Sequence, residues 1–161
     1  MSSPTATDLP HLRRCVELAR EALASGDEPF GSLLLETSRV RIEERNRVNS
    51  GDATRHPEFE IARWAAMHLT PDERRNAVVY TSGEHCAMCS AAHAWAGLGA
   101  IVYAGSAAQL TRWRHDWGLG ESPVAPLTIR EVAPGIHVRG PEPSLADELR
   151  ELHARSAGIA G

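Results

Sequence analysis

Two short stretches of this chain limit what it can fold into more than any other feature. "HPE" places His56 two residues before Glu58, and "HCAMC" places Cys86 three residues before Cys89. Each stretch opens a segment whose apolar residues recur at helical spacing, so we expect both at helix N-termini. There the helix dipole and free backbone N–H groups favour negatively charged sulfur. If these side chains act as one group, the fold must bring two helix N-termini together.

Two thiolates and one imidazole provide three of the four ligands of a tetrahedral zinc ion. A structural zinc site normally has a fourth protein ligand, whereas a catalytic site leaves that position to water, whose pKa the metal lowers to about 7. We predict one Zn²⁺ per chain, held by His56, Cys86 and Cys89. Glu58 is the predicted catalytic residue, because it would reach that water without binding the metal.

The remaining sequence alternates between helical and strand-like segments. We expect helices at 9–25, 56–69, 86–98, 107–116 and 144–158, and strands at 29–36, 39–46, 77–82, 100–105 and 127–132. A tight turn at Thr37 and Ser38 would join the first two strands into a hairpin. The strand and helix alternation after residue 56 is typical of βαβ crossovers, so the predicted class is α/β with a sheet covered on both faces.

Composition narrows the possible classes of protein. With 161 residues, 42% apolar and 24% charged, the chain is expected to form a single domain over 1–161. A net charge of −4 offers no general attraction to nucleic acid, so we do not expect nucleic acid as a partner. No segment has the roughly 18 apolar residues of a membrane span, and no secretory signal is recognised. Three cysteines, an odd number, favour reduced thiols in a cytoplasmic location, with Cys15 in the core.

These motifs resemble the zinc-dependent cytidine deaminase superfamily, whose pattern is H-x-E followed by P-C-x-x-C. The resemblance covers about residues 10–132 and includes the hairpin and the two apolar strands around the cysteines. "PFGS", Asn46 and "HAW" are most similar to the branch of guanine deaminases and tRNA adenosine deaminases. The resemblance implies a three-layer α/β/α fold with a mixed five-stranded sheet, and a homodimer. The last expected helix would form a C-terminal tail at about 143–158, beyond the region of resemblance.

The same resemblance implies further site residues. Asn46 would hydrogen-bond the substrate, Phe30 would line the base pocket, and Asp116 or else Glu121 would hold the base. Each has a simpler interpretation, respectively a turn residue, a core residue and solvated loop charges. His85 stands where the pattern has proline, and we expect it to cap the helix or to hydrogen-bond near the metal rather than to bind it.

The function predicted from these residues is hydrolytic deamination of a small ring. The expected substrate is a free nucleobase or related amino-substituted heterocycle, such as a guanine-like purine, a cytosine-like pyrimidine or a triazine, with release of ammonia. Deamination of adenosine in tRNA is the alternative within enzymes. A zinc-stabilised interaction module is the alternative outside them, although such a module would not require Glu58.

Overall fold

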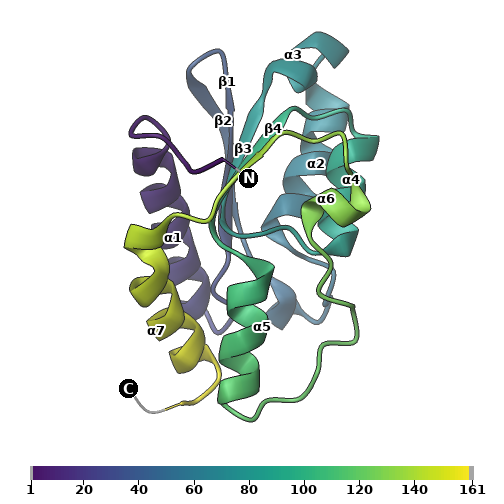
Figure 1. Cartoon of the computed structure of the whole chain (residues 1–161). Helices are drawn as coiled ribbons and strands as arrows, with labels where there is room; N and C mark the ends of the chain where they lie inside the picture. The colour runs from purple at the N-terminus through teal and green to yellow at the C-terminus, as the bar shows by residue number, and fades with distance from the viewer. Residues whose placement is uncertain (1, 160–161) are drawn as a thin grey trace.

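The computed structural model describes residues 2–159, which contain one five-stranded sheet (Figure 1). The strand order is β2-β1-β3-β4-β5, where β1 pairs antiparallel with both β2 and β3, and β3, β4 and β5 run parallel. The sheet is therefore mixed, as predicted. The strand bounds are β1 Gly31–Glu36, β2 Arg39–Arg45, β3 Val78–Gly83, β4 Ala100–Gly105 and β5 Val138–Arg139.

Helices cover both faces of this sheet, so the predicted three-layer α/β/α fold is confirmed. Helices α1 and α7 pack together on one face, and α2 and α4 pack together on the other (Figure 1). No helix among residues 2–159 is long and apolar enough to cross a membrane. The helix bounds are α1 Leu9–Ala24, α2 Pro57–His68, α3 Pro71–Asn76, α4 Ala87–Trp95, α5 Ala107–Asp116, α6 Ile129–Val132 and α7 Ala146–Ser156.

The predicted hairpin turn between β1 and β2 is confirmed. Thr37 and Ser38 have φ angles of 49° and 59°, and Glu36 pairs with Arg39 across the turn. Two consecutive residues with positive φ match the right-handed twist of the strands that they join. The hairpin forms without glycine, which shows that the sheet stabilises a turn that these side chains do not favour by themselves.

The prediction of a strand at residues 127–132 is wrong, because this segment contains helix α6. Thr128 is the N-cap of α6: its Oγ1 accepts a hydrogen bond from the amide of Glu131, whose carboxylate accepts one from the Thr128 amide. This reciprocal pair is a capping box, which favours a helix start over the strand that the apolar residues suggested. The fifth strand lies further along the chain, at β5. A second capping box, between Thr70 and Glu73, begins α3, which we did not predict.

The first helix is anchored in the core. Cys15 is fully buried, as predicted, within a cluster that joins α1 to the sheet and to α7. Asp8 stands at the N-cap of α1, but its side chain does not bond to the amides of the helix. Its carboxylate accepts hydrogen bonds instead from Tyr80 on β3 and Arg139 on β5. Asp8 therefore joins three elements rather than capping one.

Candidate metal centre and active site

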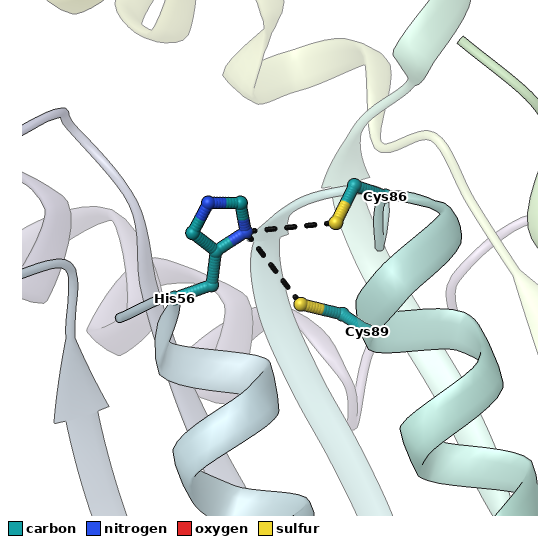
Figure 2. Close-up of side chains that lie close together, drawn as sticks. All are labelled: His56, Cys86 and Cys89. Carbon is teal, nitrogen blue, oxygen red and sulfur yellow. Dashed lines mark hydrogen bonds between the residues drawn. The ribbon is translucent and has the colours of Figure 1, made fainter. Parts of the chain in front are cut away.

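The predicted ligands meet at one point in space (Figure 2). Nδ1 of His56 lies 3.5 Å from Sγ of Cys86 and 3.6 Å from Sγ of Cys89. A tetrahedral zinc ion with ordinary Zn–S and Zn–N bonds would hold a nitrogen and a sulfur about 3.6 Å apart. Among residues 2–159, these three form the one group of His, Cys, Asp or Glu side chains arranged to hold a metal ion. The donor set and its spacing therefore fit zinc.

Local structure explains why the three side chains converge. His56 is the N-cap of α2 and Pro57 is its first residue, where a missing N–H costs no hydrogen bond. Cys86 is the N-cap of α4, and Cys89 lies in its first turn. Helices α2 and α4 pack side by side, and the contacts of His56 with both cysteines show that their N-termini lie close together.

The electrostatics of the cluster favour a bound cation. A hydrogen bond from Cys89, with a further one from His56, lowers the pKa of Cys86 to about 4 despite its burial. The same pairing with Cys86, together with burial, raises the pKa of Cys89. The hydrogen bond with Cys86 raises the pKa of His56. The cluster therefore favours a thiolate at Cys86, and a divalent cation would take the place of the shared protons.

Glu58 lies beside this cluster and is 6% exposed. Its Oε1 accepts hydrogen bonds from Oγ1 of Thr81 at 2.8 Å and from Oγ of Ser32 at 3.2 Å. Burial raises the pKa of the Glu58 carboxyl, and the charge of His56 offsets part of this shift. A carboxyl group with a raised pKa, next to a metal centre, has the properties of a general acid–base.

A cavity of about 160 Å³ adjoins the metal centre, and a larger groove of about 780 Å³ lies outside it. Glu58 and Cys86 line only the inner cavity, whereas His56 and Arg114 line both. Helix α7 borders the outer groove in the same chain through Ser156. The other residues of the inner cavity are Phe30, Glu84, Ala107, Leu110, Thr111, Ser122, Val124, Ala125, Pro126 and Leu127.

Of the four predicted substrate-binding residues, two line the cavity or the groove and two line neither. Phe30 lines both the cavity and the groove, and Glu121 lines the groove. Asp116 is exposed at the end of α5 and lines neither. Asn46 is fully buried and also lines neither; its Oδ1 accepts a hydrogen bond from the Val48 amide.

His85 is neither a metal ligand nor a cap. Its ring is 1% exposed and packs edge-on against His93, with ring centroids 5.5 Å apart. Neither ring nitrogen has a hydrogen-bond partner within residues 2–159, so the hydrogen bond that we expected is not observed. Burial lowers the pKa of His85 well below its usual value, which keeps the ring neutral.

Several residues that support the site were not predicted from the sequence. Ser32 and Thr81 hold Glu58, and no short motif marks them, because they lie on strands far from it in sequence. Glu84 accepts hydrogen bonds from the amides of Ala107 and Ile129, which ties β3 to α5 and α6. Its position two residues before Cys86 was the available signal.

Comparison with known proteins agrees with this geometry. The family model of the cytidine and deoxycytidylate deaminase zinc-binding region matches residues 5–105. A probable cytosine deaminase from Schizosaccharomyces pombe is 32% identical over 129 residues, which are 78% of this chain and 75% of that protein. The guanine deaminase of Bacillus subtilis is 36% identical over 95 residues, or 58% of this chain and 61% of that protein. The tRNA-specific adenosine deaminase 2 of Xenopus laevis is 29% identical over 99 residues, or 57% of each.

The fold is also that of solved deaminases. The guanine deaminase structure from Nitrosomonas europaea superposes with a TM-score of 0.70 over 96% of this chain and 86% of that chain, at 23% identity. Fold and family match together define a zinc-binding hydrolytic deaminase. The chain belongs to the cytidine and deoxycytidylate deaminase zinc-binding family. The zinc cofactor predicted from the sequence is thereby confirmed.

Proposed function

We propose that this deaminase acts on a free nucleobase or a related amino-substituted heterocycle. The main observation in support of this proposal is that His56, Cys86 and Glu58 together line one small cavity. Its volume of about 160 Å³ is below the roughly 300–1,000 Å³ of pockets for drug-sized ligands, which favours a single small ring system.

In the proposed reaction, water replaces the amino group of the ring, and ammonia leaves. His56, Cys86 and Cys89 would hold the zinc ion, which supplies activation of water by lowering its pKa to about 7. Glu58 would take a proton from water and deliver it to the departing nitrogen. The side chain of Phe30 supports this proposal as an apolar wall of the cavity.

We also propose further substrate contacts, each of which rests on fewer observations. Glu121 borders the outer groove and would contact a substituent that extends from the ring. Asn46 has a buried amide nitrogen, Nδ2, without a partner in residues 2–159, and this donor supports its assignment. Only the family resemblance supports a substrate-binding role for Asp116, because Asp116 lines neither the cavity nor the groove.

The relation to tRNA deaminases makes tRNA the second candidate substrate. The outer groove, with a volume of about 780 Å³, is larger than a free base requires, and this is the observation in favour of tRNA. The net charge of −4 argues against it, since binding to nucleic acid depends mainly on phosphate contacts. An interaction module without catalysis does not explain why Glu58 is buried beside the metal centre.

We also propose that residues 1–161 form a single catalytic domain and that the protein is located in the reducing cytoplasm. The third proposal is that the protein forms a homodimer. The side chains of Trp95 and Met67, on the adjacent helices α4 and α2, are 90% and 77% exposed, which favours a partner surface there. Sedimentation of the wild type and of Trp95→Glu tests the dimer. A dimeric wild type and a monomeric variant are expected; a monomeric wild type contradicts the proposal.

A substrate panel tests the proposed function directly. The zinc-loaded protein is incubated with guanine, cytosine, adenine, an aminotriazine and tRNA, and ammonia release and inosine formation are measured. Turnover of at least one free ring is expected, with slower inosine formation in tRNA. Inosine formation that outpaces every free base would make tRNA the substrate, and no turnover at all would favour the interaction module.

A further inference from the structure

Two hydroxyl groups surround the carboxylate of Glu58, and neither belongs to the metal centre. Ser32 on β1 and Thr81 on β3 are fully buried and lie directly opposite one another in the sheet. Oγ1 of Thr81 is 2.8 Å from Oε1 of Glu58, and Oγ of Ser32 is 3.2 Å from the same oxygen. Oγ of Ser32 is also 2.9 Å from Oγ1 of Thr81, so its single hydrogen can be donated either to Glu58 or to Thr81. Both contacts therefore converge on one of the two carboxylate oxygens.

We propose that Ser32 and Thr81 are positioning residues that hold Oε1 of Glu58 and leave Oε2 to carry the transferred proton. The inference rests on the proposed role of Glu58 as the proton carrier. A carboxyl group can rotate about its last side-chain bond, so proton transfer in a fixed direction requires one oxygen to be held. The sheet supplies this anchor, because β1 and β3 are central paired strands.

The choice of hydroxyl groups has a chemical reason. A hydroxyl group both donates and accepts hydrogen bonds, whereas a lysine or arginine side chain only donates. The hydroxyl of Thr81 has a second acceptor within reach, the carbonyl oxygen of Gly83 at 2.9 Å. With the proton on Oε2, Oε1 remains an acceptor, so Thr81 can keep donating to it whether or not the carboxyl carries a proton. A guanidinium partner would instead fix the carboxylate as an anion.

A purely structural role for the two hydroxyls is the competing explanation. Opposed Ser and Thr side chains on antiparallel strands stabilise a sheet through their own hydrogen bond. That role requires Ser32 and Thr81 but not Glu58. The two explanations therefore differ in whether the effect of removing a hydroxyl depends on the carboxylate.

The first experiment measures kinetics on the best substrate of the panel. Thr81→Val keeps the shape of the side chain but removes the hydroxyl, and kcat should fall roughly tenfold, with KM changed by less than about twofold. Ser32→Ala should lower kcat less, by about threefold, because its contact is longer. Thr81→Ser keeps a hydroxyl and should restore most of the activity. An equal loss in Thr81→Ser and Thr81→Val, or a loss confined to KM, would overturn the inference.

The second experiment does not require turnover. The urea midpoint of zinc-loaded Thr81→Val is compared with that of the wild type, and the same change is then made in a Glu58→Leu background. The shift in midpoint should fall to less than half in that background, because no carboxylate is left to bond. Ser82→Ala is the control: Ser82 is buried on the same strand, but it accepts from the Gly31 amide, so its shift should be the same in both backgrounds.

The two experiments separate failure of this inference from failure of the proposed function. Equal midpoint shifts for Thr81→Val in both backgrounds overturn the positioning role, whatever the enzyme turns over. A reduced shift in a protein that deaminates nothing in the panel supports the contact with Glu58 and rejects the proposed function alone.

Discussion

Two buried carboxyl groups of this protein have opposite electrostatic environments. Asp8 is 2% exposed and Glu58 is 6% exposed. Burial by itself would raise the pKa of Asp8, but hydrogen bonds from Arg139, the Thr5 amide and Tyr80 outweigh it and hold the pKa far below its usual range. At Glu58 burial dominates, and the pKa is raised. The same chemical group is a fixed anion in one place and ready to take up a proton in the other.

The difference comes from the partners together with the stronger desolvation of Glu58. Arg139 places two N–H groups on Asp8, at 2.8 and 3.0 Å, so the carboxylate is paired with a full positive charge. Glu58 has two neutral hydroxyl groups, from Ser32 and Thr81. A paired carboxylate stabilises structure, whereas one held by hydroxyls can change its charge during a reaction.

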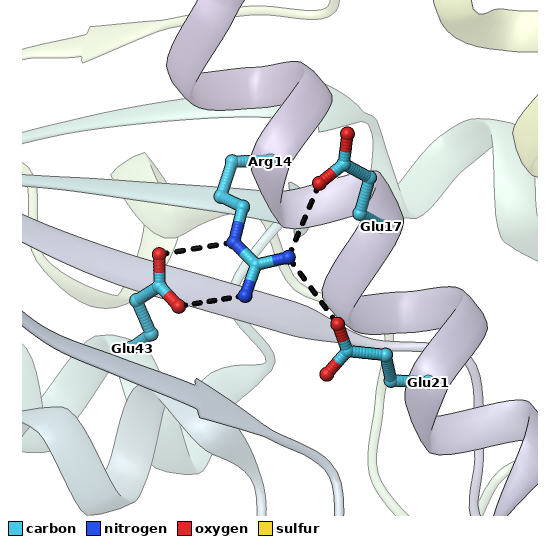
Figure 3. A network of polar contacts seen from close by, with 4 residues as sticks. All are labelled: Arg14, Glu17, Glu21 and Glu43. Carbon is cyan, nitrogen blue, oxygen red and sulfur yellow. Dashed lines mark hydrogen bonds and ion pairs between the residues drawn. The ribbon is translucent and has the colours of Figure 1, made fainter.

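An exposed network on α1 shows a third environment (Figure 3). Arg14 binds Glu43 on β2 through two hydrogen bonds, at 2.8 and 3.0 Å, and also contacts Glu17 and Glu21 on its own helix. The Arg14 side chain is 34% exposed, so water competes for these contacts. We expect this network to matter less than either buried carboxyl group.

The largest expected effect comes from removing the metal next to Glu58. Cys86→Ser replaces a thiolate ligand and should lose most of the zinc, with loss of turnover and a lower melting temperature, because metal binding contributes to folding. Elemental analysis measures the zinc content, ammonia release measures turnover, and a thermal melt measures the melting temperature. Cys15→Ser is the control, since Cys15 is a buried thiol of the core and should leave the zinc content intact. Undiminished zinc in Cys86→Ser would contradict the ligand assignment.

The second expected effect is a loss of kcat with the fold retained. Glu58→Gln keeps the shape of the side chain but cannot move a proton, so kcat should fall by at least about a hundredfold while zinc content and fold are retained. Glu60→Gln, on the same helix, should retain activity. The comparison fails if Glu58→Gln keeps full activity, or if it loses its fold as a structural carboxylate would.

The third expected effect is a loss of folding stability with kcat unchanged. Asp8→Asn removes the negative charge that pairs with Arg139 and should lower the free energy of unfolding by about 2 kcal/mol, with kcat unchanged. Urea unfolding at neutral pH measures the loss. The exposed Asp147→Asn provides the control and should have little effect. A large fall in kcat with unchanged stability would reverse the roles assigned to the two carboxyl groups.

The fourth effect is the pH dependence of the Asp8 contribution. The pKa of Asp8 is lowered in the folded protein, so its stabilisation is fully present above the unfolded value of about 3.9 and is lost as the pH falls further. The difference in stability between wild type and Asp8→Asn should therefore shrink below about pH 4. Urea midpoints measured from pH 7 to pH 3 test the sign; a difference that grows toward low pH would contradict it.

The smallest expected effect is at the exposed network. Arg14→Met keeps the length of the side chain and should cost at most about 1 kcal/mol of unfolding free energy, because the contacts are screened by water. The loss should decrease further in concentrated salt. A loss as large as that of Asp8→Asn would show that burial does not separate these environments.

Much of the fold follows from local sequence patterns. The hairpin, the helices at both metal-binding motifs and the parallel strands around them were predicted from spacing alone, because helical and strand periods are local properties. The segment at 127–132 was not, since the capping box of Thr128 and Glu131 outweighs its apolar residues. His85 was also misjudged, because only packing against His93 decides where its ring points.

The metal ligands and the proposed acid–base group were predicted from the sequence. Two thiolates, an imidazole and a carboxylate have fixed chemistry, and their spacing at two helix starts leaves little choice. The partners of Asp8 and Glu58 depend on the tertiary fold. Asp8 meets Arg139 across 131 residues of chain, and Glu58 meets Thr81 across 23. The strand order brings these groups together, and no local pattern specifies which strands become neighbours, so the pKa directions follow from the fold.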